Sequence, residues 1–157
     1  MNSIKFQSYN IISPKDENIN DIADYIINNN IFNLPLRLRD NQELCEILLD
    51  KFYFYVFDLN FNQDVFKNAN IDKLTNFFIE TYRYQIPDSL KDNVTLINNL
   101  LKKNSYVAIH LIESNLSIYD QIDKDVLANC INSNMFLEIN IDNLKNDVDL
   151  CNKLIDL

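Results

Sequence analysis

The sequence contains no glycine and no tryptophan among its 157 residues, and it has one histidine and three prolines. Phosphate-cradling loops, dinucleotide-binding fingerprints and the nucleophile elbow of serine hydrolases all need glycine, because a Cβ atom would obstruct the tight turn or the ligand. The missing glycine therefore excludes the usual nucleotide-binding loops. It also leaves asparagine as the residue that best tolerates a left-handed helix end.

Basic side chains are few, with 14 Lys and Arg against 23 Asp and Glu and a net charge of −9 at pH 7. This charge opposes any binding that must neutralise phosphates, so we expect direct contact neither with nucleic acid nor with a membrane. The apolar runs are shorter than the roughly 18 residues of a membrane span, and the first residues lack the apolar stretch of a secretory signal. We expect a soluble protein in the cytoplasm of its own cell or of a host cell.

Reactive side chains are scattered. Cys45, Cys130 and Cys151 are far apart and form no C-x-x-C pair. The sequence therefore suggests neither a zinc site nor a disulfide framework, and we expect free thiols that act as small core residues. The single histidine, His110, has no serine or cysteine in a recognisable motif before it. We expect no cofactor and no metal, and we interpret the protein as non-enzymatic.

An internal repeat organises the chain. The segment 34–44 resembles 86–96, and Pro35 and Pro87 are 52 residues apart. A third copy begins at Leu144, 54 residues after Leu90. We predict a single domain with an N-terminal cap at 1–15, two repeats at 16–67 and 68–119, and a partial third repeat at 120–157.

Each period divides into half-units of about 22 and 30 residues, and each half-unit has the apolar spacing of a helix. The apolar positions are the sixth, seventh, tenth and eleventh after each start, which lie on one stripe of an α-helix. We therefore predict that Leu44, Leu96 and Leu150 are equivalent and buried. The half-units start at Asp16, Leu38, Asn68, Leu90, Asp120 and Leu144.

The sixteenth position is aromatic in each of the five half-units that reach it. We predict that this column is a core ladder, in which each ring fills the joint between neighbouring units. In the alternative, a ligand-binding stripe, the rings would be exposed. The column consists of Phe32, Phe54, Tyr84, Tyr106 and Phe136.

Short polar residues mark the expected helix ends. Asp40 or Asn41, Asp92, and Asn146 or Asp147 precede apolar stripes, where they can cap the first turn. Glu43 is placed to close a capping box with Asp40. We expect left-handed ends at Asn30, Asn104 and Asn134.

These features predict an all-α fold, with stacked helical hairpins in a short α-solenoid-like array. A helix is expected to start at Ser13-Pro14. The second, shorter helix of a hairpin is expected at 105–111 and 135–141. Pro35 and Pro87 interrupt that second helix in alternate half-units.

The half-unit from Leu90 to Ala108 resembles a family of short α-helical tandem repeats of unknown function. Members begin with a Leu-Lys-Asn-Asp type of start and end the first helix with Lys-x-Asn-Gly. This chain has Ile31, Ser105 and Met135 where the family has glycine. The resemblance implies an all-helical repeat fold and no particular activity.

The favoured function is a protein–protein interaction module, because stacked hairpins expose an extended surface. The alternative is a small acidic inhibitor, of the kind phages use against bacterial defence, that occupies the channel of a basic nucleic-acid-binding protein. A hydrolase that uses the pairs Asp120/Asp123 or Asp147/Asp149 is the third reading. Residues 113–157 hold nine acidic and three basic side chains, so partner binding is predicted there, at Asp120, Asp123, Asp125, Glu138 and Asp142.

Overall fold

The computed structural model describes residues 18–157 except 84–85, 104, 135–143 and 145. Within these residues the regular structure is entirely helical, with eight α-helices and four short 3₁₀ helices. The predicted all-α class is confirmed. Over the described residues, no helix is long and apolar enough to cross a membrane.

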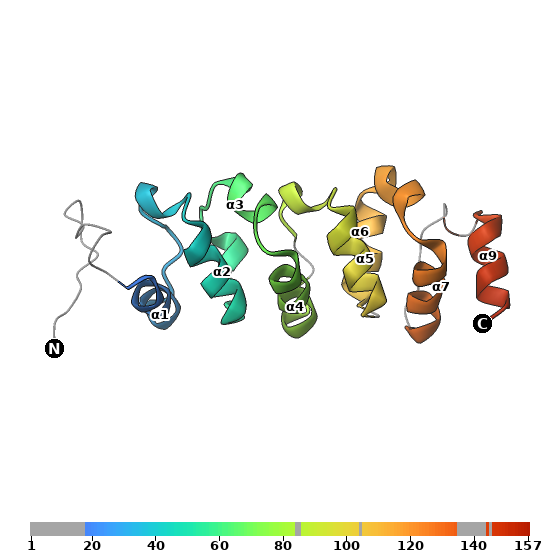
Figure 1. Cartoon of the computed structure of the whole chain (residues 1–157), viewed down its shortest axis with the longest axis horizontal. Helices are drawn as coiled ribbons and strands as arrows, with labels where there is room; N and C mark the ends of the chain where they lie inside the picture. The colour runs from blue at the N-terminus through green and yellow to red at the C-terminus, as the bar shows by residue number, and fades with distance from the viewer. Residues whose placement is uncertain (1–17, 84–85, 104, 135–143, 145) are drawn as a thin grey trace.

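Six main helices lie side by side in chain order along the longest axis of the molecule (Figure 1). Each packs on the next, and α6 packs on α5. The main helices are α1 (Ile19–Asn29), α2 (Gln42–Asp50), α4 (Ile71–Thr81), α5 (Val94–Lys102), α7 (Lys124–Ser133) and α9 (Val148–Ile155). The connections carry η1 (Leu36–Leu38), η2 (Val56–Asp58), α3 (Gln63–Lys67), η3 (Asp88–Leu90), α6 (Tyr106–Ser114) and η4 (Leu116–Gln121).

The apolar stripes meet in one continuous core. Leu44, Leu96 and Leu150 are 0%, 0% and 1% exposed, which confirms that these three residues are buried. Burying a leucine side chain contributes about 1.5–3 kcal/mol. The stacking of successive stripes therefore stabilises helices that are too short to persist alone.

The starts of three main helices have the same geometry. The side chains of Asn41, Asn93 and Asp147 accept hydrogen bonds from the amides of Leu44, Leu96 and Leu150 at 2.8, 3.0 and 3.0 Å, respectively. Asn41 and Asp147 are each one of two alternatives predicted from the sequence, and both are confirmed as caps.

The predicted cap at Asp92 is wrong by one residue, because Asn93 occupies the cap position. The capping box of Asp40 and Glu43 is also absent, since α2 begins at Gln42 after the cap Asn41. Asp40 and Asp92 instead accept hydrogen bonds from the side chains of Asn62 and Asn115, which directly precede α3 and η4.

Helix ends differ more from expectation. Asn30 is left-handed as predicted, with φ 47°. Asn134 has φ −115°, and its side chain donates to the Cys130 carbonyl at 2.7 Å, so the predicted left-handed conformation is wrong there. Phe52 and Tyr82 also have a positive φ, each 50°. Both follow the start of a predicted half-unit by 14 residues, as Asn30 does.

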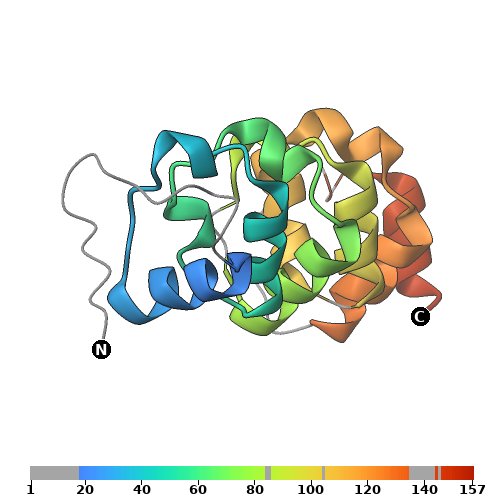
Figure 2. The same ribbon diagram turned by 60° about the vertical axis from the view of Figure 1, so that its left-hand side comes forward.

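The return segments between main helices are not all helical. The predicted second helix at 105–111 corresponds to α6. After α1 the chain instead returns to η1 as an extended segment (Figures 1 and 2), so a second helix does not follow every main helix. The predicted helix at 135–141, the helix start at Ser13, the cap at 1–15 and Asn104 lie outside the described residues.

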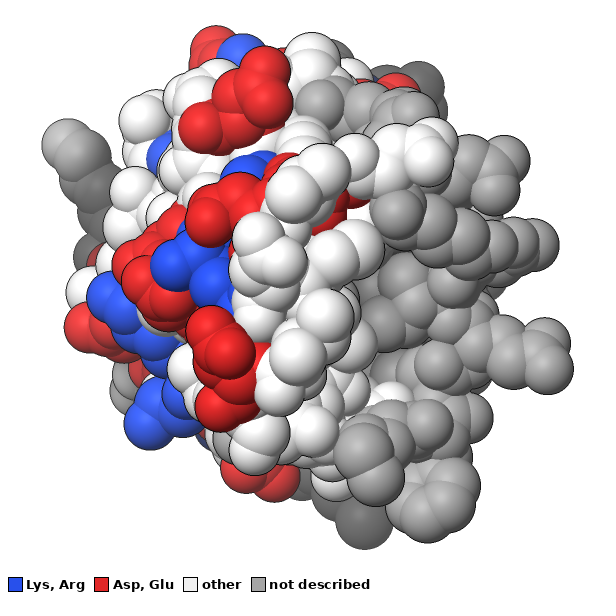
Figure 3. Space-filling view, turned by 90° about the vertical axis from the view of Figure 1, so that its right-hand side faces the viewer, with Lys and Arg blue, Asp and Glu red and all other residues white. Residues whose placement is uncertain are grey.

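At the C-terminal end, uncharged side chains form a band beside a strip of mixed charges (Figure 3). On α9, Val148 and Ile155 are 73% and 80% exposed. Leu49 and Leu101, which hold the position of Ile155 in earlier half-units, are fully buried. Leu49 and Leu101 are covered because α4 packs on α2 and α7 packs on α5.

Candidate functional site

Five exposed aromatic side chains lie close in sequence to the ends of three main helices. Each lies within five residues of the last residue of α1, α2 or α4. We call this set the aromatic surface. It consists of Phe32 (46% exposed), Phe52 (45%), Phe54 (47%), Tyr55 (42%) and Tyr82 (61%).

Ring contacts connect three of the members, which come from the segments after α1 and α2. Tyr55 lies edge-to-face against Phe32 and Phe54, with ring centroids 5.5 and 5.4 Å apart. Further along the array, Tyr82 stacks on the half-buried Tyr106 with centroids 6.3 Å apart. Such pairs contribute about 0.5–1.5 kcal/mol beyond their burial.

Arg83 connects the end of α4, which carries Tyr82, to Phe54 in the segment after α2. This residue follows Tyr82 in the chain, is 5% exposed, and its guanidinium carbon lies 5.1 Å from the ring centroid of Phe54 and 5.6 Å from that of Phe57. It donates hydrogen bonds to the Phe54 carbonyl and, at 2.8 Å, to the Asp58 carboxylate. These contacts fix the position of the Phe54 ring relative to α4.

Two members have strained backbones. A left-handed conformation costs roughly 1–2 kcal/mol for a residue with a Cβ atom, and a bulky side chain there is a genuine outlier. Phe52 and Tyr82 adopt it, although the equivalent Asn30 shows that a better-suited residue type fits this position. Since Phe52 and Tyr82 are 45% and 61% exposed, core packing does not explain the choice of an aromatic.

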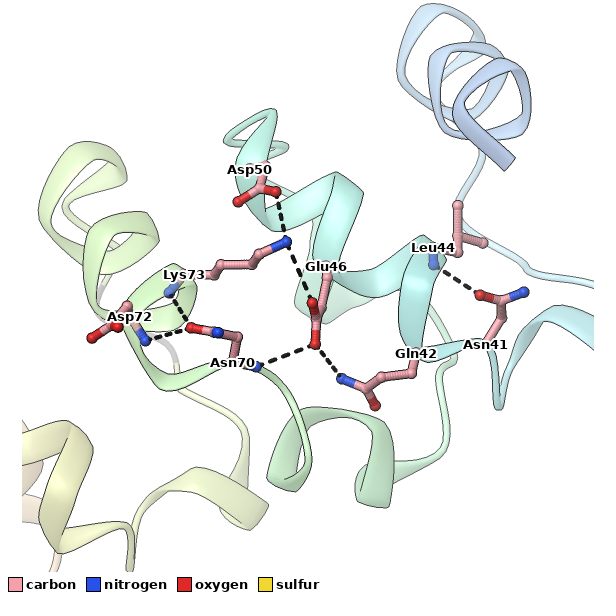
Figure 4. A network of polar contacts seen from close by, with 8 residues as sticks. All are labelled: Asn41, Gln42, Leu44, Glu46, Asp50, Asn70, Asp72 and Lys73. Atoms are coloured by element: carbon pink, nitrogen blue, oxygen red, sulfur yellow. Dashed lines mark hydrogen bonds and ion pairs between the residues drawn. The ribbon is translucent and has the colours of Figure 1, made fainter. Parts of the chain in front are cut away.

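A polar network holds α2 against α4 (Figure 4). The Lys73 ammonium lies 2.7 Å from the Asp50 carboxylate and 3.3 Å from that of Glu46. Glu46 accepts a hydrogen bond from the Asn70 amide at 3.4 Å, and the Asn70 side chain caps α4. The bond to Asp50 is the main reason why the pKa of Lys73 is raised. The network sets the register of the two helices whose ends carry Phe52 and Tyr82.

The prediction of a buried aromatic ladder is wrong for the first two members of the column. Phe32 and Phe54 are exposed, and Tyr106 is half-buried. Tyr84 and Phe136 lie outside the described residues. Phe32 and Phe54 fall in return segments, so the spacing of the preceding helix does not determine which way these side chains face.

The acidic residues predicted to bind a partner have local roles where the structure describes them. Asp123 caps α7 and accepts from the amides of Asp125 and Val126 at 3.0 and 3.3 Å. Asp125 pairs with Lys153 of α9, and Asp120 is exposed. The other two predicted residues, Glu138 and Asp142, lie outside the described residues.

Three ionisable side chains with shifted pKa values fasten α9 to the segment before it. The Tyr119 hydroxyl donates to the Asp147 carboxylate at 2.6 Å, and the Lys124 ammonium lies 2.9 Å from the Tyr119 ring centroid. Burial is the largest cause both of the raised pKa of Tyr119 and of the lowered pKa of Lys124. The bond from Tyr119 lowers the pKa of Asp147. Since Asp147 also caps α9, the arrangement serves packing.

The thiols and the histidine do not form a site. Burial raises the pKa of Cys45 to about 12 and that of Cys130 to about 11, so both are unreactive thiols of the core, as predicted. Cys151 is half-buried. His110 is exposed, with its ring edge-on to Tyr106. Among the described residues, no group of three or more His, Cys, Asp or Glu side chains could hold a metal ion.

No family model matches the chain, and neither a curated protein nor a solved structure matches it.

Proposed function

We propose that this protein is a non-enzymatic interaction module that binds another protein through the aromatic surface. The observation that carries the proposal is the presence of Phe52 and Tyr82, exposed and left-handed, at positions where asparagine costs less. Strain of this kind concentrates at functional sites. Binding a partner would bury these rings, which would explain why aromatic residues occupy strained positions.

The architecture that displays the surface is, in this proposal, a short α-solenoid-like array with a repeat of about 52 residues. The equivalent caps and buried leucines at Asn41–Leu44 and Asn93–Leu96 support it. The half-unit ends at Asn30, Phe52 and Tyr82 have the same left-handed conformation, which supports the half-unit division. In such an array successive units present equivalent positions in a row, which suits binding to an extended partner.

The composition of the surface also fits an interface. Tyrosine and phenylalanine are enriched at protein interfaces, and tyrosine is a typical hot-spot residue. The contacts of Phe54 with Tyr55 and Arg83 hold its ring before a partner arrives. A pre-organised ring loses less conformational entropy on binding than a free one.

A narrower function is an inhibitor that occupies the basic channel of a nucleic-acid-binding protein. The excess of 23 acidic over 14 basic side chains favours it, because opposite charge accelerates association with such a partner. It predicts steeply salt-dependent association and competition with nucleic acid for the partner. A partner that binds nucleic acid equally well in the presence of this protein would exclude the inhibitor and leave the interaction module.

The test uses substitutions that spare the fold. In Phe52→Asn/Tyr82→Asn, both residues become the type found at Asn30, so relief of backbone strain offsets the lost partial burial. We expect each single change to alter the free energy of unfolding by less than about 1 kcal/mol. Quantitative affinity capture from the native cell should lose the bound partner with the double variant.

The matched control is Leu36→Asn, which removes a 75% exposed apolar side chain in η1, outside the aromatic surface. The control should retain the partner. Equal capture by wild type, control and double variant would overturn the proposed function.

A further inference from the structure

We infer that the segment bound by the aromatic surface carries arginine side chains. This inference rests on the proposed function and specifies the chemistry of the partner. The face of an aromatic ring is electronegative and attracts a guanidinium, which also stacks on it because both are planar.

The protein itself already places a guanidinium on one of these rings, that of Phe54. Arg83 lies over Phe54 and Phe57 and has its hydrogen bonds to the Phe54 carbonyl and the Asp58 carboxylate. It approaches from the protein side and is buried. A second guanidinium, from a partner, would meet the exposed parts of the same set of rings.

The helix ends beneath the surface add negative potential. The last carbonyls of a helix carry a partial negative charge, which a basic residue in the last turn normally offsets. In α1, α2 and α4 the last turn contains no basic residue. Lys51, the residue after α2, has its ammonium 2.8 Å from the Asp24 carboxylate.

The charged side chains in the part of the chain that carries the surface are also mainly negative. Residues 18–83 hold ten acidic and six basic side chains. The basic residues just after α2 and α4 already bind carboxylates: Lys51 binds Asp24, and Arg83 binds Asp58. Asp58 is 43% exposed, and Glu80 is exposed two residues before Tyr82. A cationic partner therefore finds complementary charge at the edge of the rings.

The experiment titrates the whole chain, labelled with ¹⁵N, with an acetylated and amidated peptide of alternating alanine and arginine. A second peptide replaces each arginine by citrulline, which has nearly the same shape and no charge. We expect the arginine peptide to shift the amide signals of 52–55 and 82–83, and the citrulline peptide to bind at least about tenfold more weakly. Tyr82→Asn should weaken the binding of the arginine peptide, whereas Leu36→Asn should leave its affinity unchanged.

Three results would overturn the inference: equal binding of the two peptides, shifts confined to the acidic segment 120–125, or no shift with either peptide. None of these results tests the proposed function. That function is tested independently, by capture of the native partner with wild type and its loss with Phe52→Asn/Tyr82→Asn. Failure of that capture experiment alone would instead leave a cation-binding surface without a demonstrated protein partner.

Discussion

Arg83 supports Phe54 twice, by stacking its guanidinium 5.1 Å from the ring centroid and by donating a hydrogen bond to the Phe54 carbonyl. Both contacts join the end of α4 to the segment that follows α2. A buried charged residue that joins the segments after α2 and α4 therefore positions the Phe54 ring of the aromatic surface.

Arg83→Met tests this support. The change keeps an unbranched apolar stem but removes the bonds to Phe54 and to Asp58. We expect the free energy of unfolding to fall by about 1–3 kcal/mol, measured by urea denaturation. Asp58→Asn should cost less, because that carboxylate is 43% exposed and the asparagine can still accept a hydrogen bond. A loss below about 0.5 kcal/mol in Arg83→Met would show that the contact is not structural.

The helix caps make a second prediction. Asn93→Ala leaves the Leu96 amide without its partner, so the free energy of unfolding should fall by about 1 kcal/mol. Asn41→Ala should give a similar loss, because the geometry at Leu44 is the same. Asn93→Asp retains an acceptor, as Asp147 does naturally, and should be close to neutral. Unequal losses at the two equivalent sites would argue against a repeated unit.

The core gives a third prediction. Leu96 is fully buried in α5 between neighbouring helices. Leu96→Ala should cost roughly 2–5 kcal/mol, the range for a buried leucine truncated to alanine. Thr95→Ala, at the exposed neighbouring position, serves as the control and should change stability by less than about 0.5 kcal/mol. Similar losses of unfolding free energy in both variants would show that Leu96 is not in the buried stripe of α5.

The pH dependence of stability tests the fastening of α9. The hydrogen bond from Tyr119 lowers the pKa of Asp147 below its ordinary value of 3.8. A carboxylate with a lowered folded-state pKa contributes stability above the unfolded value and loses it as the pH falls through the folded value.

Asp147→Asn keeps an acceptor for the Leu150 amide but loses the charge. The stability difference between wild type and Asp147→Asn should therefore be constant above about pH 5 and shrink below about pH 4. Urea unfolding across this range measures it. A difference that stays constant down to about pH 2 would contradict the role of the charged form.

The sequence predicts what depends on helical spacing. Leu44, Leu96 and Leu150 share a capped start and a stripe with a period of 3.6, so their burial and equivalence follow from the pattern. The caps at Asn41 and Asp147 follow from the same alignment. Asp92 is misplaced because adjacent Asp and Asn side chains are both good caps, and the pattern does not distinguish neighbours.

The aromatic surface is harder to predict because it lies where that spacing ends. The spacing that aligns Phe32 with Phe54 in the sequence is compatible with an inner ladder and with an outer row alike. The left-handed conformations of Phe52 and Tyr82 escape a search for glycine or asparagine. Their distance from the half-unit start, the same as that of Asn30, is the signal that could have found them.

The most direct test of partner binding through the aromatic surface is site-specific photo-crosslinking in the native cell. The photoreactive amino acid p-benzoylphenylalanine would replace Tyr82 in one variant and Leu36 in another. We predict a discrete crosslinked species from position 82, reduced by the additional change Phe52→Asn, and no such species from position 36. The same species from both positions, or none from position 82, would contradict the account.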